Sequence, residues 1–377
     1  MVTDGSDNSN LDGPPPAAED VATPGEAGAR RGAKWMDGFA KWRDGFVATL
    51  TIPMLISVVF TYLSFMGGIN FLIDNLSHFR VQYLVFQAIY LVLATTTRRW
   101  IVIAICLAGA GCNVSEIAPF YLTKPGVADA NLPRLSVLQL NVYAPSAKHQ
   151  AVADLIAELK PDIVCLEEVT FEWDKAMTEK LAPAGYTNKI ARPRADTFGI
   201  AIYSRLPLIE PQIIESKDNN QTNHFPVPAI FTKVDCGGEA VSIIAAHPLT
   251  PMSDEYFALR NEEFAAINAA RDATVRDPFL LVGDLNCTPW SYYFHKLTLR
   301  SKVKNTALGF GLQPTWPTYL LGFRLPIDHV LASDQFIATN YQVLPNLGSD
   351  HYPVYVQLAL KPKETGTTAK PRQPYRK

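Results

Sequence analysis

Residues 279–286 read FLLVGDLN, a short apolar run that ends in two polar residues, Asp284 and Asn286. Short apolar runs bounded by polar residues are typical of buried strands. The same arrangement recurs between residues 133 and 360: LSVLQL before Asn141, DIVCL before Glu167 and Glu168, SIIAA before His247, and a weaker run at 343–348 before Asp350 and His351. Rigid strand ends gather side chains within reach of one another, so this recurrence predicts one shared site.

The rest of this region predicts an α/β domain with mixed sheets. Two amphipathic helices are expected, at residues 147–159 and 255–275, because apolar residues recur there at helical spacing. Further strands are expected at 198–203, 227–234, 240–246, 327–332 and 353–360. Several of these strands follow one another without an intervening helix, which argues against a doubly wound parallel sheet.

The polar residues at the strand ends suit a divalent metal ion and a phosphoester. Carboxylate and amide oxygens are the hard ligands that Mg²⁺ and Mn²⁺ prefer, and the set lacks the thiolates of a zinc site. His247 and His351 supply groups that can accept or donate protons beside a phosphate. A single Asp or Asn after a strand is usually a turn former, but the repeated pattern favours a catalytic group.

Composition limits the classes of partner. The whole chain carries 34 Lys and Arg against 36 Asp and Glu, a formal charge of −2, so there is no global attraction to nucleic acid. Between residues 133 and 360 the acidic excess is larger, with 19 Lys and Arg against 24 Asp and Glu. The five cysteines are too few and too scattered for a disulfide framework.

The N-terminal third has a different character. Residues 1–45 are rich in Gly, Ala, Pro, Asp and Asn, and are expected to form a disordered cytoplasmic segment. Residues 46–66 carry no charge and are long enough to cross a bilayer about 30 Å thick. Two shorter apolar runs follow at 81–97 and 100–115, so residues 46–120 form a membrane region with two or three spans, three being favoured. Residues 361–377 are expected to form a basic disordered tail.

The basic residues predict an orientation. Five Lys and Arg residues between 30 and 43 precede the first span, whereas the loop after it carries only Arg80. The positive-inside rule then places the N-terminus in the cytoplasm, and three spans place residues 133–360 outside it. A shallow re-entrant hairpin over the two shorter runs gives the same result. Only a two-span arrangement returns the domain to the cytoplasm.

Five motifs together resemble the endonuclease/exonuclease/phosphatase superfamily: PDIVCLEEV at 161–169, HP at 247–248, GDLN at 283–286, IDHVLAS at 327–333 and GSDH at 348–351. They occur in family order within residues 133–360. The resemblance implies a DNase I-like four-layer α/β sandwich with mixed sheets, preceded here by N-terminal transmembrane helices. The layout and the LQPTWP stretch at 312–317 are also similar to membrane-anchored bacterial members.

The resemblance implies a set of metal and phosphate ligands. Glu168 would be the principal Mg²⁺ ligand, with Mn²⁺ as a substitute ion, and Asp350 would bind the metal directly or through water. Asn141 would bind the phosphate or the metal. The family usually has Gln-Glu where this chain has Glu167-Glu168. Because side chains alternate along a strand, we expect Glu168 to face the site, with Glu167 on the opposite face or forming an extra acidic wall.

The resemblance also implies the catalytic roles. His247 would bind the phosphoryl oxygen or protonate the leaving group. Asp284 and Asn286 would orient the attacking water and hold the phosphate. Asp328 would orient His351, which would act as the general base.

These inferences predict a Mg²⁺-dependent phosphoesterase in the bacterial cytoplasmic membrane, with several spans and a periplasmic or extracytoplasmic catalytic domain. The expected partners are a phosphoester of unknown class and the lipid bilayer, and no protein partner is expected. One alternative is a nuclease that acts on DNA or RNA outside the cytoplasm. Another is a catalytically inactive, membrane-tethered binding module.

Overall fold

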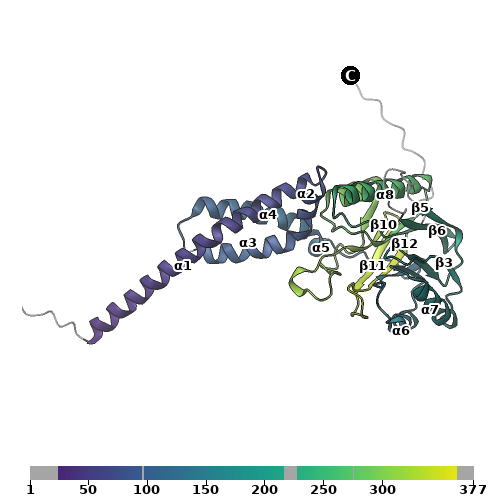
Figure 1. The fold of residues 1–377 in the computed structure, drawn as a ribbon, viewed down its shortest axis with the longest axis horizontal. Helices are drawn as coiled ribbons and strands as arrows, with labels where there is room; N and C mark the ends of the chain where they lie inside the picture. The colour runs from purple at the N-terminus through teal and green to yellow at the C-terminus, as the bar shows by residue number, and fades with distance from the viewer. Residues whose placement is uncertain (1–23, 96, 216–226, 275, 363–377) are drawn as a thin grey trace, which may run out of the picture. The chain divides into compact units, whose positions relative to one another are not determined.

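The computed structural model describes residues 24–95, 97–215, 227–274 and 276–362 (Figure 1). The chain divides into two compact units, residues 1–51 and residues 52–377. The second unit contains two six-stranded mixed sheets. Both sheets belong to the region predicted as the α/β domain.

In the first sheet, one parallel pair lies between antiparallel neighbours. The strands in spatial order are β11 (Phe336–Val343), β12 (Val354–Leu360), β1 (Arg134–Asn141), β2 (Ile163–Glu167), β4 (Ile200–Ser204) and β3 (Asn188–Arg192). Strands β1 and β2 run parallel, and helix α6 (His149–Leu159) connects them. Because the pair is parallel, the carboxyl ends of both strands reach the same edge of the sheet.

The second sheet repeats this plan. Its strands in spatial order are β5 (Ile209–Glu215), β6 (Pro228–Cys236), β7 (Glu239–Ala246), β8 (Phe279–Asp284), β10 (Asp328–Ser333) and β9 (Val303–Asn305). Strands β7 and β8 form the parallel pair, and helix α8 (Asp254–Ala273) connects them.

The two sheets pack face to face and helices cover their outer faces. Alternate residues such as Val137, Ile243 and Val330 form the core between the sheets. The intervening residues of the first sheet pack with α6 and α7 (Phe171–Leu181), and those of the second pack with α8 and α9 (Tyr292–Ser301). Figure 1 shows α8 on one side of the sheets and α6 and α7 on the other. The expected four-layer sandwich with mixed sheets is confirmed.

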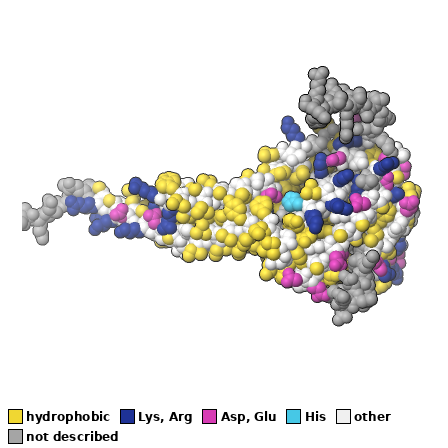
Figure 2. All heavy atoms as spheres, turned by 90° about the horizontal axis from the view of Figure 1, so that it is seen from above, with side chains coloured by type: hydrophobic (Ala, Val, Ile, Leu, Met, Phe, Trp, Pro, Cys, Tyr) yellow, Lys and Arg dark blue, Asp and Glu magenta, His cyan; other side chains and the backbone are white. Residues whose placement is uncertain are grey.

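The N-terminal helices are α1 (Pro24–Leu63), α2 (Phe71–Leu76), α3 (Arg80–Ala94), α4 (Trp100–Ile117) and α5 (Pro119–Leu122), with 3-10 turns η1 (Ser64–Met66) and η2 (Ser77–Phe79). Within the described part of the chain, three segments are long and apolar enough to cross a membrane: Gly28–Met66, Phe71–Ala94 and Trp100–Ile117. Figure 2 shows hydrophobic side chains gathered over these helices, and Lys and Arg near the start of α1.

Buried polar side chains connect the apolar helices to one another. The Asn113 amide donates to Thr61 Oγ1 at 3.0 Å and to Gln87 Oε1 at 3.1 Å. All three residues have no exposed surface. Small and polar residues that bond across helices are typical of packing in a lipid environment, where an unpaired amide is costly.

Two expectations differ from the structure. Residues 24–45, expected to be disordered, are helical because they continue α1, so they add turns to an existing helix instead of nucleating one. Stacked rings four residues apart, Trp35 on Phe39 and Trp42 on Phe46, line this helix. The weak strand at 343–348 is also wrong, since β11 ends at Val343. Residues 1–23 and 363–377, the rest of the predicted disordered segments, lie outside the described residues.

Candidate active site

The predicted site residues come from strand ends of both sheets. Strand β1 ends at Asn141 and β2 at Glu167, and these two residues are partners in the parallel register. Strand β8 ends at Asp284, whose antiparallel partner in β10 is Asp328. His351 lies just before β12. The face-to-face packing of the sheets brings these ends together.

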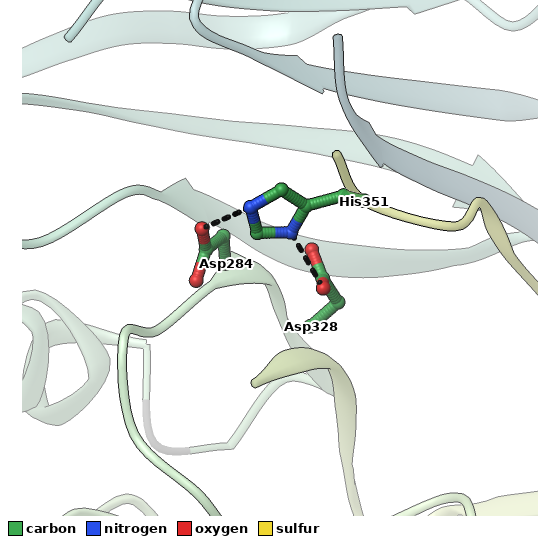
Figure 3. A group of neighbouring side chains, drawn as sticks. All are labelled: Asp284, Asp328 and His351. Atoms are coloured by element: carbon green, nitrogen blue, oxygen red, sulfur yellow. Dashed lines mark hydrogen bonds and ion pairs between the residues drawn. The ribbon is translucent and has the colours of Figure 1, made fainter. Parts of the chain in front are cut away.

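His351 lies between two buried carboxylates (Figure 3). Its Nδ1 is 2.9 Å from Asp328 Oδ2, and its Nε2 is 3.6 Å from Asp284 Oδ2. Each of the three residues is at most 4% exposed. Potential ligand atoms of all three lie within 4.8 Å of one another.

Asp284 Oδ2 has two further nitrogen neighbours. The Asn141 amide donates to it at 3.3 Å, and Nε2 of His247 lies 3.5 Å away. Asn286 is anchored beside it: its backbone N–H donates to Asp284 Oδ1, and its side-chain amide donates to the carbonyl of Pro248. The structure therefore brings Asn141, His247 and Asn286 to the same aspartate.

Glu168 reaches the site because the strand ends one residue before it. Its φ is +59°, a left-handed conformation that breaks the alternation of side chains along β2. Glu168 Oε1 accepts a hydrogen bond from the Asn141 amide at 3.0 Å, and Oε2 accepts one from the backbone N–H of Ala144. The half-buried carboxylate is thus fixed by two donors.

Glu167 lies beside Asp328 and shares a hydrogen-bond donor with it, so it is not on the opposite face of the sheet. Its Oε2 accepts a hydrogen bond from the Gln139 amide at 3.0 Å, and the same nitrogen donates to Asp328 Oδ1 at 2.8 Å. Of the two alternatives for Glu167, the extra acidic wall agrees with this contact. Gln139 itself was missed in the sequence. Alternation could have found it, because Gln139 is two residues before Asn141 on the same face of β1.

Asp350 lies near His351 but bonds elsewhere. The indole Nε1 of Trp316 donates to Asp350 Oδ2 at 3.1 Å, and Oδ1 of this carboxylate is buried without a hydrogen-bond partner. The Trp316 ring is 6.2 Å from the His351 ring between centroids. His329, next to Asp328, points away from the site and bonds the carbonyl of Cys287.

A model of the Endonuclease/Exonuclease/phosphatase family matches residues 138–351. The chain belongs to this family. Every site residue from Gln139 to His351 lies within the matched region. Members of the family are hydrolases that act on phosphoesters, and they generally depend on a divalent metal ion.

Solved structures support the same fold. The chain is similar to an endonuclease/exonuclease/phosphatase from Beutenbergia cavernae, with 21% identity and a TM-score of 0.51 over 61% of this chain and 72% of that one. It is similar to the human Nocturnin catalytic domain with bound sulfate, at 19% identity and a TM-score of 0.50 over 61% and 96%. It is also similar to D. rerio TDP2 in complex with a single-stranded DNA product, at 15% identity and a TM-score of 0.50 over 61% and 99%. No curated protein sequence matches the chain.

Burial and charge shift the pKa values in this family member's site. Burial disfavours a charge on His351, but Asp328 and Asp284 outweigh it and raise the pKa of His351 to about 10. Burial raises the pKa of Asp284 to about 7, against the opposing effect of His351. Burial by itself would raise the pKa of Asp328. The charge of His351 and its hydrogen bond to Asp328 outweigh burial and lower this pKa below its usual value. For Glu167, burial and the two aspartates raise the pKa well above its usual range. Burial lowers the pKa of His247 to about 4.

The donor set fits a divalent metal ion. Four of the buried, unpartnered polar atoms among the described residues lie in this region: Gln139 Oε1, Glu167 Oε1, His247 Nδ1 and Asp350 Oδ1. Buried polar atoms are normally paired, so this concentration indicates a missing polar partner. Three acidic side chains in or beside the group are oxygen donors of the type that Mg²⁺ and Mn²⁺ prefer: Glu168, Asp284 and Asp350.

Proposed function

We propose that this chain is a membrane-anchored, Mg²⁺-dependent phosphoesterase that hydrolyses a phosphodiester or phosphomonoester by attack of water. The observation that carries the proposal is the buried group formed by Asp284, Asp328 and His351, with unpartnered polar atoms beside it. Such a group is costly to maintain in a protein interior unless it binds an ion or a polar ligand.

His351 is proposed as the general base. Asp328 faces its Nδ1, which keeps a proton on that atom and leaves Nε2 directed toward Asp284. A neutral ring in this tautomer can accept the proton of a water that Asp284 and Asn286 orient. Asp328 and Asp284 raise the pKa of His351 to about 10, so proton acceptance near neutral pH requires that the charge of the two carboxylates be offset.

Glu168 and Asn141, with Asp350 directly or through water, are the residues proposed to hold Mg²⁺ or Mn²⁺. When bound, the cation supplies positive charge that offsets the carboxylates and polarises the phosphoryl oxygens. Asn141, Asn286 and His247 are proposed to bind the phosphate. His247 is buried next to Asp284, where its ring can contact a phosphoryl oxygen or the departing oxygen.

The helical ends support an orientation with the catalytic domain outside the cytoplasm. Three spans bring the end of α1, the start of α3 and the end of α4 to one side of the membrane, and the Arg98–Arg99 turn to the other. The contacts between the apolar helices and the α/β domain lie on the first of these two sides. The Asn75 amide donates to the carbonyl of Pro251, and the Trp290 indole donates to the carbonyl of Glu116. We therefore propose a multi-pass protein of the bacterial cytoplasmic membrane.

The activity can be tested with the full chain in detergent and Mg²⁺, against DNA, RNA, phospholipids and soluble phosphomonoesters. Hydrolysis of any one class that Glu168→Gln abolishes supports the proposal. Conversion of nucleic acid alone identifies the nuclease alternative. If no class is converted while ligands still bind, the protein is an inactive binding module.

The orientation can be tested by fusions after Ala130. An active alkaline phosphatase fusion and a dark GFP fusion are expected, because the former folds outside the cytoplasm and the latter fluoresces only inside. The reverse pair of results contradicts the three-span arrangement.

A further inference from the structure

A loop rich in exposed apolar side chains lies beside the membrane helices. Between Thr318 and Arg324 it carries Tyr319 (70% exposed), Leu320 (47%), Leu321 (80%) and Phe323 (57%). Four large apolar residues in one short loop are unusual on a water-facing surface and mark an interaction site.

One hydrogen bond fixes the position of this loop along the membrane helices. The Gln82 amide in α3 donates to the carbonyl of Gly322 at 3.3 Å. The candidate span Phe71–Ala94 includes Gln82, but its first part contacts the α/β domain through Asp74, Asn75 and His78. The part that is free to lie in lipid therefore begins near the start of α3 at Arg80, two residues before Gln82. The loop therefore lies where a membrane-spanning helix emerges from the lipid, which is also where Tyr side chains are enriched.

The base of the loop is bonded to the catalytic segment. The backbone N–H of Thr318 donates to the carbonyl of Asp350 at 2.9 Å, and its hydroxyl donates to the carbonyl of Ser349. Arg324, at the other end of the loop, donates to the carbonyl of Thr318. These contacts hold the base of the apolar loop against the two residues that precede His351.

Residues of α2 and η2 also contact the loops around Asn286. Asn75 in α2 bonds Pro251, and the neighbouring Thr250 hydroxyl donates to Asn286 Oδ1 at 2.9 Å. His78 in η2 lies 3.0 Å from the Thr288 hydroxyl, on the loop that follows Asn286. Residues 71–82 therefore contact loops that lead to both His351 and Asn286.

We propose that loop 318–324 inserts into the lipid leaflet beside the start of α3, and that the substrate is a phosphoester of a membrane lipid taken from that leaflet. This rests on the proposed phosphoesterase function and names its substrate class. The loop is continuous with the membrane-spanning surface, so lipid is the occupant that its position favours. The acidic excess of residues 133–360 disfavours a polyanionic nucleic acid.

Insertion can be measured without any catalysis. The full chain with Cys112→Ser and Leu321→Cys is labelled with the fluorophore NBD and reconstituted into vesicles that contain lipids with quenching spin labels. Leu299→Cys provides a matched control, because Leu299 in α9 is 79% exposed and is followed by Arg300. Strong quenching at position 321 and little at 299 is expected. Equal quenching at the two positions, or energy transfer between labelled copies without lipid quenching, overturns the insertion.

The substrate class is tested with a pair of substrates. One is phosphatidylglycerol, phosphatidylethanolamine or phosphatidic acid in vesicles, and the other is the short-chain, water-soluble form of the same lipid. Leu321→Ser with Phe323→Ser should lower hydrolysis of the vesicle lipid by about tenfold or more, because the site loses its position at the surface, and should leave the soluble form unchanged. Leu299→Ser should change neither rate.

Each failure has a separate meaning. Equal losses on the vesicle and soluble lipids contradict a role for the loop in lipid access. A wild-type protein that hydrolyses nucleic acid or soluble phosphomonoesters but no lipid overturns the substrate class and keeps the phosphoesterase function. A wild-type protein inactive on every phosphoester removes the proposed function and the substrate class together, whatever the quenching shows.

Discussion

His351 Nδ1 lies 2.9 Å from Asp328 Oδ2, and both side chains are almost completely buried. The other oxygen of Asp328 accepts a hydrogen bond from Gln139, so the carboxylate cannot rotate without losing one of its partners. Asp328 thus fixes the position of the histidine ring and favours a proton on its Nδ1.

Asp328→Asn should lower kcat by about 10²- to 10⁴-fold, the usual contribution of general acid–base catalysis. The Gln139 amide requires an oxygen, so the new NH₂ group faces His351 Nδ1 and forces the ring proton onto Nε2. The ring then cannot accept a proton from water. The measurement is kcat at saturating Mg²⁺, with the thermal midpoint as a folding control. A variant within a few-fold of wild type contradicts the tautomer argument.

Glu168→Gln and Glu167→Gln should differ strongly. Glu168 is a proposed metal ligand, so its substitution should abolish turnover and weaken Mn²⁺ binding measured by calorimetry. Burial and the two neighbouring aspartates raise the pKa of Glu167 well above its usual range, which favours the neutral form, so Gln closely replaces it and activity should fall only a few-fold. Similar losses from both variants, at equal thermal stability, would reverse the assignment.

Removal of divalent metal should abolish activity, and Mg²⁺ or Mn²⁺ should restore it. A ligand that binds only the folded state also raises stability, by about 2.7 kcal/mol at a hundred times its Kd. The thermal midpoint of wild type should therefore rise with Mg²⁺ concentration, and that of Glu168→Gln should stay flat. Full activity in excess chelator excludes the metal mechanism.

Glu263 should make stability depend on pH. It is buried in α8 and accepts a hydrogen bond from the backbone N–H of Leu249. Burial raises its pKa to about 8, above the value of 4.5 expected in the unfolded chain. The folded state then binds the proton more tightly, so this stabilisation is complete below pH 4.5 and is lost as pH rises through 8.

Glu263→Gln keeps an acceptor for Leu249 but cannot ionise. The variant should have a thermal midpoint similar to wild type at pH 5 and a higher midpoint at pH 9, with the other titrating groups unchanged. If the thermal midpoints of the two proteins change in parallel between pH 5 and pH 9, Glu263 does not ionise within this pH range.

The buried ion pair between α2 and α8 should be important for stability. Arg260 donates to Asp74 Oδ2 at 2.9 Å, neither side chain is exposed, and the Ser291 hydroxyl also donates to Asp74. Asp74→Asn leaves the Arg260 charge buried without its partner, which should cost about 3–5 kcal/mol of unfolding free energy. The double variant Asp74→Asn, Arg260→Met should lose less than the sum of the single variants. Strict additivity would show that the two charges do not interact.

The sequence by itself determined most of the α/β framework. Strands such as β2 and β8 are fully buried on both faces, so they appear as continuous apolar runs whose ends are marked by polar residues. The four edge strands, β3, β5, β9 and β11, were not found. Half-exposed edge strands lack such a run, because solvent on one side removes the requirement for apolar residues.

The sequence also determined which residue types meet at the site, but only the tertiary structure decided their geometry. Alternation along β2 placed one glutamate in the site. The left-handed backbone of Glu168 brings both glutamates to it, where Glu168 bonds Asn141 and Glu167 bonds Gln139. The pairing of Asp328 with His351, the clamp of Asp74 on Arg260, and the contact of Gln82 with Gly322 join residues that are 23, 186 and 240 positions apart. Local patterns determine strands and helices because each depends on neighbours a few residues away. Contacts at such separations depend on how the sheets and helices pack, which no local pattern contains.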